Sequence, residues 1–190
     1  GHNMIGTMSC GAAAGLSKVL DETGGRIVVL GTPAEETDGA KVEMAKKGMF
    51  EDIDAAMKLH PEDKTYESGD SLAMDALQFD FKGKTSHAAS SPHEGINALD
   101  AVILTFNGIN ALRQHVTPDV RIHGIVKEGG KAANIVPDRA VAQFYIRAGK
   151  KDYLREVTEK VKNIARGAAL MTGASLEINN YEISYDDMNT

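Results

Sequence analysis

The chain has 190 residues, 42% of them hydrophobic, which suffices for one large α/β unit or two smaller ones. Its formal net charge is -6 and its Lys and Arg are scattered, which argues against a nucleic-acid partner, because neutralising phosphates requires clustered basic residues. No apolar stretch approaches the roughly 20 residues of a membrane span, so no membrane partner is expected. The single cysteine, Cys10, cannot form an internal disulfide, and we expect a cytoplasmic protein.

The first third of the chain predicts an open α/β sheet. Small and apolar residues at 4–21 predict a helix packed closely against that sheet. Residues 26–30 predict a strand whose apolar run at 27–30 is unbroken, as in a parallel strand covered on both faces, and residues 53–59 predict the next strand. A helix predicted at 40–49 lies between them, so the order is that of a βαβ crossover.

The remainder of the chain changes pattern near residue 71. We expect strands at 72–82, 121–126, 141–147 and 176–181, and helices at 95–115 and 151–172. This β-α-β-β-α-β order predicts a ferredoxin-like unit. The expected fold class is therefore α/β, with a partial catalytic domain at 1–70, an inserted lid or dimerisation domain at 71–183, and a return to the first domain at 184–190.

The candidate catalytic and metal-binding residues are predicted to lie at the carboxyl edge of the first sheet. His2 precedes a helix, Glu35 and Glu36 follow the strand ending at Leu30, and His60 ends the next strand. Ligands of open α/β sheets collect at that edge. Two imidazoles and a carboxylate suit zinc, and a neighbouring carboxylate can accept the proton of a bound water. The alternative is that the adjacent glutamates form an ordinary solvated surface.

A series of motifs strongly resembles the M-twenty metallopeptidases, in particular their amidohydrolase branch of aminobenzoyl-glutamate hydrolases, indole-acetyl-amino-acid hydrolases and dipeptidases. In chain order the motifs are GHNMIGTMSCGAAAGL, VVLGTPAEE, KLHP, GKTSHAASSPHEGINALDA, NGINALRQH, GGKAANIVPD and FYIRA. The resemblance implies hydrolysis of an amide bond in an N-acyl amino acid or small dipeptide by metal-activated water. It also implies two divalent metal ions, zinc in the first place, with manganese or cobalt as alternatives.

The resemblance further implies roles for seven residues. The metal ligands are His2, Glu36 and His60, and the general base is Glu35. The lid residues are His87, which stabilises the oxyanion in a partner's active site, and Asn134 and Arg147, which bind the substrate. An Arg fork suits a carboxylate.

Plainer interpretations of the lid residues remain open. His87 can belong to an ordinary polar loop, Asn134 can be a turn residue before Pro137, and Arg147 can be a surface charge on its strand. The second candidate function is a non-catalytic oligomerisation or small-molecule-binding module. We expect a homodimer or larger homo-oligomer, because the predicted strand at 121–126 is an exposed edge that can pair with its twin.

Two elements of the family pattern are not found in this sequence. The Cys that precedes the Gly-His signature is absent, as is a later His ligand near the carboxyl end. Because the chain opens on Gly1 without Met, we expect further sequence upstream. We also expect weak metal binding and little activity from these 190 residues alone, and activity from a longer parent protein.

Overall fold

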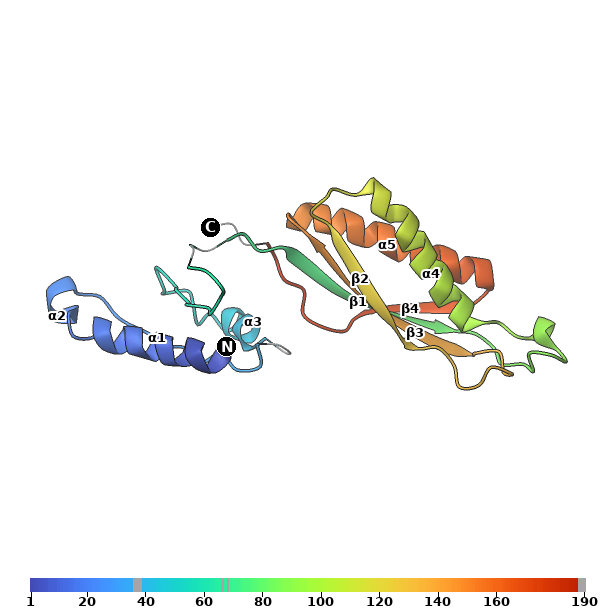
Figure 1. Cartoon of the computed structure of the whole chain (residues 1–190), viewed down its shortest axis with the longest axis horizontal. Coiled ribbons are helices and arrows are strands. Elements are labelled where there is room, and N and C mark those ends of the chain that lie inside the picture. Colours follow the sequence, from blue (N-terminus) through green and yellow to red (C-terminus); the bar gives the residue numbers. More distant parts are fainter. Residues whose placement is uncertain (36–38, 66, 68, 188–190) are drawn as a thin grey trace. The chain divides into compact units, whose positions relative to one another are not determined.

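The computed structural model describes residues 1–35, 39–65, 67 and 69–187. The chain forms two compact units, Gly1–Glu67 and Ser68–Thr190 (Figure 1). The domain boundaries expected after residues 70 and 183 stay predictions.

The described residues of the first unit form three helices, α1 (His2–Leu16), α2 (Leu20–Thr23) and α3 (Ala40–Lys46). The helix expected at residues 4–21 is therefore divided, and its longer part starts two residues earlier. Gly24 ends α2 and Gly39 starts α3, both with positive φ (68° and 60°), a conformation that glycine adopts without steric cost.

Neither strand expected in the first unit forms. Residues 26–30 and 53–59 belong to no ladder, and Val28 and Val29 are 42% and 51% exposed. A strand covered on both faces depends on hydrogen-bonded neighbours and on helices above and below it. No segment among the described residues of this unit supplies those neighbours, so the βαβ crossover is not made here.

The second unit confirms the β-α-β-β-α-β expectation. Its strands are β1 (Ala73–Lys82), β2 (Arg121–Glu128), β3 (Arg139–Ala148) and β4 (Ser175–Asn180), and its helices are α4 (Ala98–Leu112) and α5 (Lys151–Thr172). Two 3-10 turns, η1 (Pro92–Glu94) and η2 (Arg113–His115), flank α4. The sheet order is β2-β3-β1-β4, with all neighbours antiparallel. The longer helix expected at 95–115 is thus an α-helix with a 3-10 turn at its end.

Both helices cover the same face of this sheet (Figure 1). Strand residues alternate, so one side of each strand faces the helices and the other faces away. Leu77, Phe79 and Phe81 of β1 and Phe144 of β3 are at most 1% exposed and pack against α4 and α5. Burying each such side chain contributes about 1.5–3 kcal/mol, which explains why this unit folds around its sheet.

The far face of the sheet carries polar pairs. Gln143 donates to Gln78 across β3 and β1 at 2.8 Å. Arg139 holds the buried carboxylate of Asp80 with two hydrogen bonds, Nε to Oδ1 at 3.1 Å and Nη2 to Oδ2 at 2.6 Å, and reaches Glu128 at 3.0 Å. This bidentate hydrogen bonding to Asp80 raises the pKa of Arg139. The uncovered face of the sheet is therefore organised by side-chain pairs.

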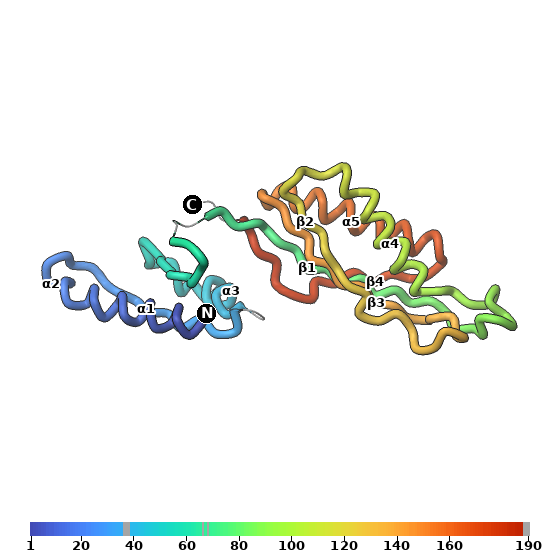
Figure 2. Tube along the Cα trace, viewed as in Figure 1, coloured from blue at the N-terminus to red at the C-terminus, as the bar shows by residue number. Residues whose placement is uncertain are grey.

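The end of the chain also belongs to this unit. Tyr185 and Met74 exchange two backbone hydrogen bonds, of 2.8 and 2.9 Å. Asp187 accepts from the backbone N–H of Lys151 at 2.8 Å. The chain trace in Figure 2 shows the segment after β4 returning alongside the start of β1.

Candidate functional site

In the first unit, His2 and Glu35 come together. His2 is the first residue of α1, and its Nε2 lies 3.4 Å from Oε2 of Glu35. Both side chains are about half exposed, at 54% and 44%. Two of the residues expected at one site, which are 33 positions apart, therefore meet within the described part of this unit.

The turn that carries Glu35 is strained. Ala34 has φ 56°, in the left-handed region that residues with a Cβ seldom occupy. The carbonyl of Ala34 accepts a hydrogen bond from the Gly39 N–H at 2.8 Å. Strain of this kind is concentrated at functional sites, where the surrounding structure maintains it. The strained backbone of Ala34 is therefore a second feature typical of a functional site, next to the carboxylate of Glu35 that is predicted to act as the base.

His60 makes a local contact only. Its Nδ1 lies 2.9 Å from the carbonyl oxygen of Pro61. A carbonyl accepts and does not donate, so Nδ1 carries the proton and Nε2 keeps its lone pair. A His fixed in this tautomer by a carbonyl is ready to bind a cation through the other nitrogen. Glu36, the third expected ligand, lies outside the described residues.

The kinds of side chain expected at the site suit a divalent cation, but the positions of the described side chains do not form a binding site for one. Two imidazoles and carboxylates are a suitable set for zinc. Across residues 1–35, 39–65, 67 and 69–187, however, no cluster of three or more His, Cys, Asp or Glu side chains is placed to hold a metal. The described residues alone therefore do not make a metal site.

In the second unit, His87 and Asn134 lie on adjacent backbones. The Ala88 N–H donates to the Asn134 carbonyl at 3.0 Å, and the Val136 N–H donates to the Ser86 carbonyl at 3.0 Å. This short antiparallel bridge is centred on His87 and Ile135. It joins two loops that lie 47 residues apart in sequence, so the structure brings together two of the three expected lid residues.

A close backbone crossing positions the His87 loop. A Cβ on Gly83 would lie 2.1 Å from the Ile96 carbonyl oxygen, so only glycine fits there. The Lys84 and Ile96 backbones then exchange two hydrogen bonds of 2.9 Å. Asn97 follows and caps α4 by accepting from the Leu99 N–H at 2.9 Å.

Arg147 lies at the opposite end of the sheet. It pairs with Met74 at the start of β1, whereas the His87 loop leaves from the end where Lys82 pairs with Arg139. The eight positions from Arg139 to Arg147 span about 26 Å of strand. One copy of this unit therefore cannot present Arg147 and His87 to the same small substrate.

Arg147 belongs to an aromatic and charged cluster that sequence reasoning missed. Its guanidinium carbon lies 5.9 Å from the ring centre of Tyr145. The Tyr145 ring also contacts His123 at 5.5 Å and Tyr181 at 5.7 Å, and its hydroxyl donates to Glu182 at 2.7 Å. Strand alternation alone places Tyr145 and Arg147 on one face, but only the register of β2 adds His123.

The electrostatics of this cluster follow from its contacts. The hydrogen bond to Glu182 raises the pKa of Tyr145, because the carboxylate stabilises the protonated phenol. Burial raises the pKa of Tyr181. Partial burial, and then the positive charges of Arg147 and Arg113, lower the pKa of His123. The cluster therefore favours a neutral imidazole beside a guanidinium.

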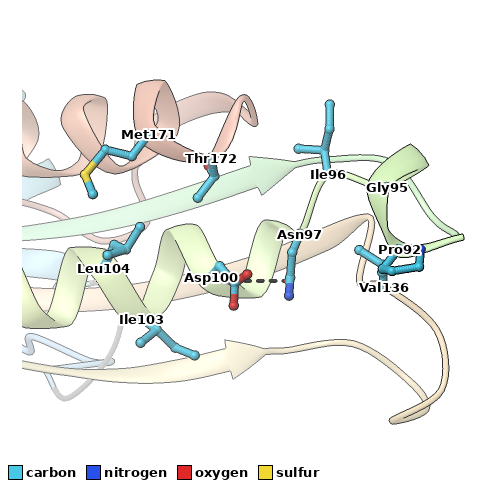
Figure 3. A pocket seen from close by; sticks show the side chains of 10 residues that line it. All are labelled: Pro92, Gly95, Ile96, Asn97, Asp100, Ile103, Leu104, Val136, Met171 and Thr172. Carbon is cyan, nitrogen blue, oxygen red and sulfur yellow. Dashed lines mark hydrogen bonds between the residues drawn. The ribbon is translucent and has the colours of Figure 1, made fainter. Parts of the chain in front are cut away.

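Two surface hollows lie elsewhere. One, of about 560 Å³, lies between the start of α4 and the end of α5 and is shown in Figure 3; its walls include Asn97, Asp100, Ile103, Val136 and Met171. The other, of about 440 Å³, lies in the first unit around Arg26 and Asp52. No residue expected at the active site lines either hollow, so neither supports a substrate pocket at those residues.

Comparison with known proteins identifies the family through the second unit. The sequence profile of the peptidase dimerisation domain matches residues 74–171, slightly more than half of the chain. The chain belongs to the M-twenty metallopeptidase family. The matched segment runs from β1 nearly to the end of α5, so it covers most of the second unit and stops before β4.

Relatives within the family are amide hydrolases by name. The chain is 37% identical over 182 residues to the Xaa-Arg dipeptidase of Mus musculus, covering 94% of this chain and 42% of that protein. It is 38% identical over 181 residues to a p-aminobenzoyl-glutamate hydrolase protein of Escherichia coli, covering 93% and 38%. The chain thus spans less than half the length of these relatives.

A solved structure shares the fold. The aminobenzoyl-glutamate utilization protein of Klebsiella pneumoniae superposes with a TM-score of 0.67 at 24% identity, over 83% of this chain and 42% of that one. At this identity the likeness concerns the fold alone. Among the helices in the described ranges, none has the length and apolar character needed to cross a bilayer.

Proposed function

We propose that the whole protein carrying these residues is a metal-dependent amidohydrolase that cleaves an amide bond in an N-acyl amino acid or a small dipeptide. Membership of the M-twenty family is the observation that carries this proposal. The activities for which the two relatives are named, those of an Xaa-Arg dipeptidase and an aminobenzoyl-glutamate hydrolase, share an amide bond next to an amino-acid carboxylate. A cytoplasmic location stays a prediction.

The proposed metal ligands are His2, Glu36 and His60, with zinc as the first choice of metal. When bound, the metal would lower the pKa of a coordinated water and polarise the scissile carbonyl. The contact of His2 with Glu35 and the Nε2 lone pair of His60 support these roles. Glu35 is proposed to accept the proton of the attacking water, which requires a carboxylate that stays outside the metal shell.

The proposed substrate-binding residues divide between two copies of the chain. A dipeptide spans only about 7 Å, so a substrate held by Arg147 is out of reach of His87 in the same unit, about 26 Å away along the strands. We propose that a homodimer built through the second unit brings the His87 loop of one protomer to the site served by the partner. Asn134 would lie at the same site as His87, because a backbone hydrogen bond joins Ala88, next to His87, to Asn134.

Replacement of Glu35 tests the enzymatic proposal. In the whole protein, Glu35→Gln keeps the size of the side chain and removes its basicity, so hydrolysis of a panel of N-acyl amino acids and dipeptides should fall about 10²–10⁴-fold. Glu22→Gln, on the short helix α2, is the matched control and should leave the rate unchanged. Equal rates of hydrolysis for both variants would refute Glu35 as the base, and no hydrolysis of any panel member by the wild-type protein would favour the alternative, a non-catalytic oligomerisation or small-molecule-binding module.

A further inference from the structure

Two backbone amides of its own loop hold the imidazole of His87. The N–H groups of Ala89 and Ser90 each lie 3.2 Å from Nδ1. A backbone amide can only donate, so Nδ1 presents its lone pair to both. The proton of the neutral ring then resides on Nε2, because an imidazole with an unprotonated Nδ1 carries its hydrogen on the other nitrogen.

The loop that supplies these amides is itself fixed. The Ser91 N–H donates to the His87 carbonyl at 3.1 Å, which closes one turn of chain around the ring. The Ala88 N–H is bonded to Asn134 on the neighbouring segment. The two donors are therefore held in place by contacts on both sides.

The other ring nitrogen is available. The side chain of His87 is exposed, and its Nε2 forms no hydrogen bond within the part of the chain that the structure describes. With its proton on Nε2, the ring is a donor at its exposed end and an acceptor only toward its own loop. In this state it has no lone pair at Nε2 with which to take a proton from a substrate or a water.

We propose that the backbone amides of Ala89 and Ser90 fix His87 as a neutral Nε2–H hydrogen-bond donor. A donor of this kind suits the role that the family resemblance implies for His87, the stabilisation of a carbonyl oxygen as negative charge develops on it, and it transfers no proton. Only the identity of the oxygen rests on the proposed hydrolase function. The tautomer is a property of this chain, and it makes Ala89 and Ser90 positioning residues that act through His87.

Nitrogen-15 NMR on the intact chain measures the tautomer directly. Spectra are recorded at about pH 8.5, where a free imidazole is neutral. The exposed rings of His93 and His115 serve as internal references. The ratio of the Nε2–H to the Nδ1–H form of His87 should exceed theirs about fivefold, the effect of roughly one net hydrogen bond. A ratio equal to the references, or a proton on Nδ1, would overturn the proposal.

A pair of variants at one position isolates the amide. Ser90→Pro removes one N–H donor, so the His87 ratio should drop toward the references. Ser90→Ala keeps the N–H and removes only the hydroxyl, so the ratio should stay at its wild-type value. An unchanged ratio in Ser90→Pro would contradict the assignment. If the proline variant does not fold, the comparison of wild-type His87 with His93 and His115 decides alone.

The experiments can refute the proposed positioning of His87 and the proposed hydrolase function independently of each other. If the tautomer ratio is as expected but His87→Ala in the whole protein leaves hydrolysis unchanged, the amides still fix the ring and its proposed place at the oxyanion is wrong. If the ratio matches the references while His87→Ala abolishes hydrolysis, the function stands and the positioning by Ala89 and Ser90 is refuted.

Discussion

The guanidinium of Arg147 lies over the ring of Tyr145, 5.9 Å from carbon to ring centre, at the end of the sheet farthest from His87. The ring of Tyr145 also contacts His123 of the neighbouring strand. This contact joins a residue expected to bind substrate to a titratable group that no sequence pattern singled out. The ionisation of His123 therefore reports on the state of Arg147.

The titration of His123 should show this coupling. Burial and then the charge of Arg147 lower its pKa, so NMR titration should give a value below the ordinary 6.5 or so. Arg147→Met removes the second cause and should shift the pKa upward, though not fully, because burial remains. Arg121→Met, opposite Arg147 on β2, is the control and should have a smaller effect. A larger shift in Arg121→Met would contradict the assignment.

The same depression has a consequence for stability. A base whose pKa is lowered by folding takes up its proton more readily in the unfolded chain, so protonation favours unfolding. The contribution of neutral His123 is complete above the unfolded-state pKa of about 6.5 and is lost as the pH falls through the lower folded-state value. In His123→Gln, the free energy of unfolding measured by urea denaturation should therefore decrease less at acid pH than it does in the wild type. Identical pH profiles for wild type and variant would refute it.

Thr158 connects α5 to the sheet. Its Oγ1 donates to Oδ2 of Asp75 on β1 at 2.7 Å, and Thr158 is 5% exposed. Thr158→Val removes the donor from a half-buried carboxylate and should lower the free energy of unfolding by about 1–3 kcal/mol in urea denaturation. Thr158→Ser keeps the hydroxyl and loses one methyl group, so its loss should be about 1 kcal/mol. Equal losses would mean that packing and not the hydrogen bond accounts for the effect.

Strand β2 should be required for self-association. It is an edge of the sheet, and Ile125 and Val126 on it are 59% and 47% exposed. A charged residue on an edge strand opposes strand pairing. Sedimentation should therefore show a dimer for the wild type and a monomer for a variant carrying Ile125→Lys and Val126→Lys. Leu170→Lys, on the exposed side of α5, is the control. A double variant that remains dimeric would place the interface elsewhere.

Mixing two inactive variants tests whether the site is shared between protomers. In the whole protein, His87→Ala and Arg147→Ala should each reduce hydrolysis. In a mixed dimer, one site would combine an intact Arg147 with the partner's intact His87, while the other site lacks both. After subunit exchange of equal amounts, about one quarter of wild-type activity should return, since half of the dimers are mixed and each has one working site. No recovery in demonstrably mixed dimers would refute the shared site.

Zinc binding by these 190 residues should be weak, because fewer than three candidate ligands meet in the described residues. In competition with a chromophoric chelator, His2→Ala and His60→Ala should each weaken binding further if the imidazole nitrogen is a ligand. His93→Ala is the control and should have no effect. Equal binding by wild type and both variants would remove His2 and His60 from the proposed ligand set.

The fold of the second unit was largely predictable from sequence. Alternation in β1 and β3 and the apolar stripe of α5 are local patterns, and each element can bury its own apolar side against the others within the same unit. The limits of α5 and the order of the elements follow from them. The strands expected at 26–30 and 53–59 failed for the opposite reason, because their stability depends on neighbours that the described residues do not supply.

By itself, the sequence determined the family and the chemical types of the candidate residues, because motifs such as KLHP and GGKAANIVPD carry that information in their order. Only the tertiary structure decided which residues meet. It brought His2 to Glu35 and His87 to Asn134, and it separated Arg147 from both lid partners by the length of β3. Contacts between distant segments depend on strand register and backbone crossings, and these are properties of the packed chain that no local pattern encodes.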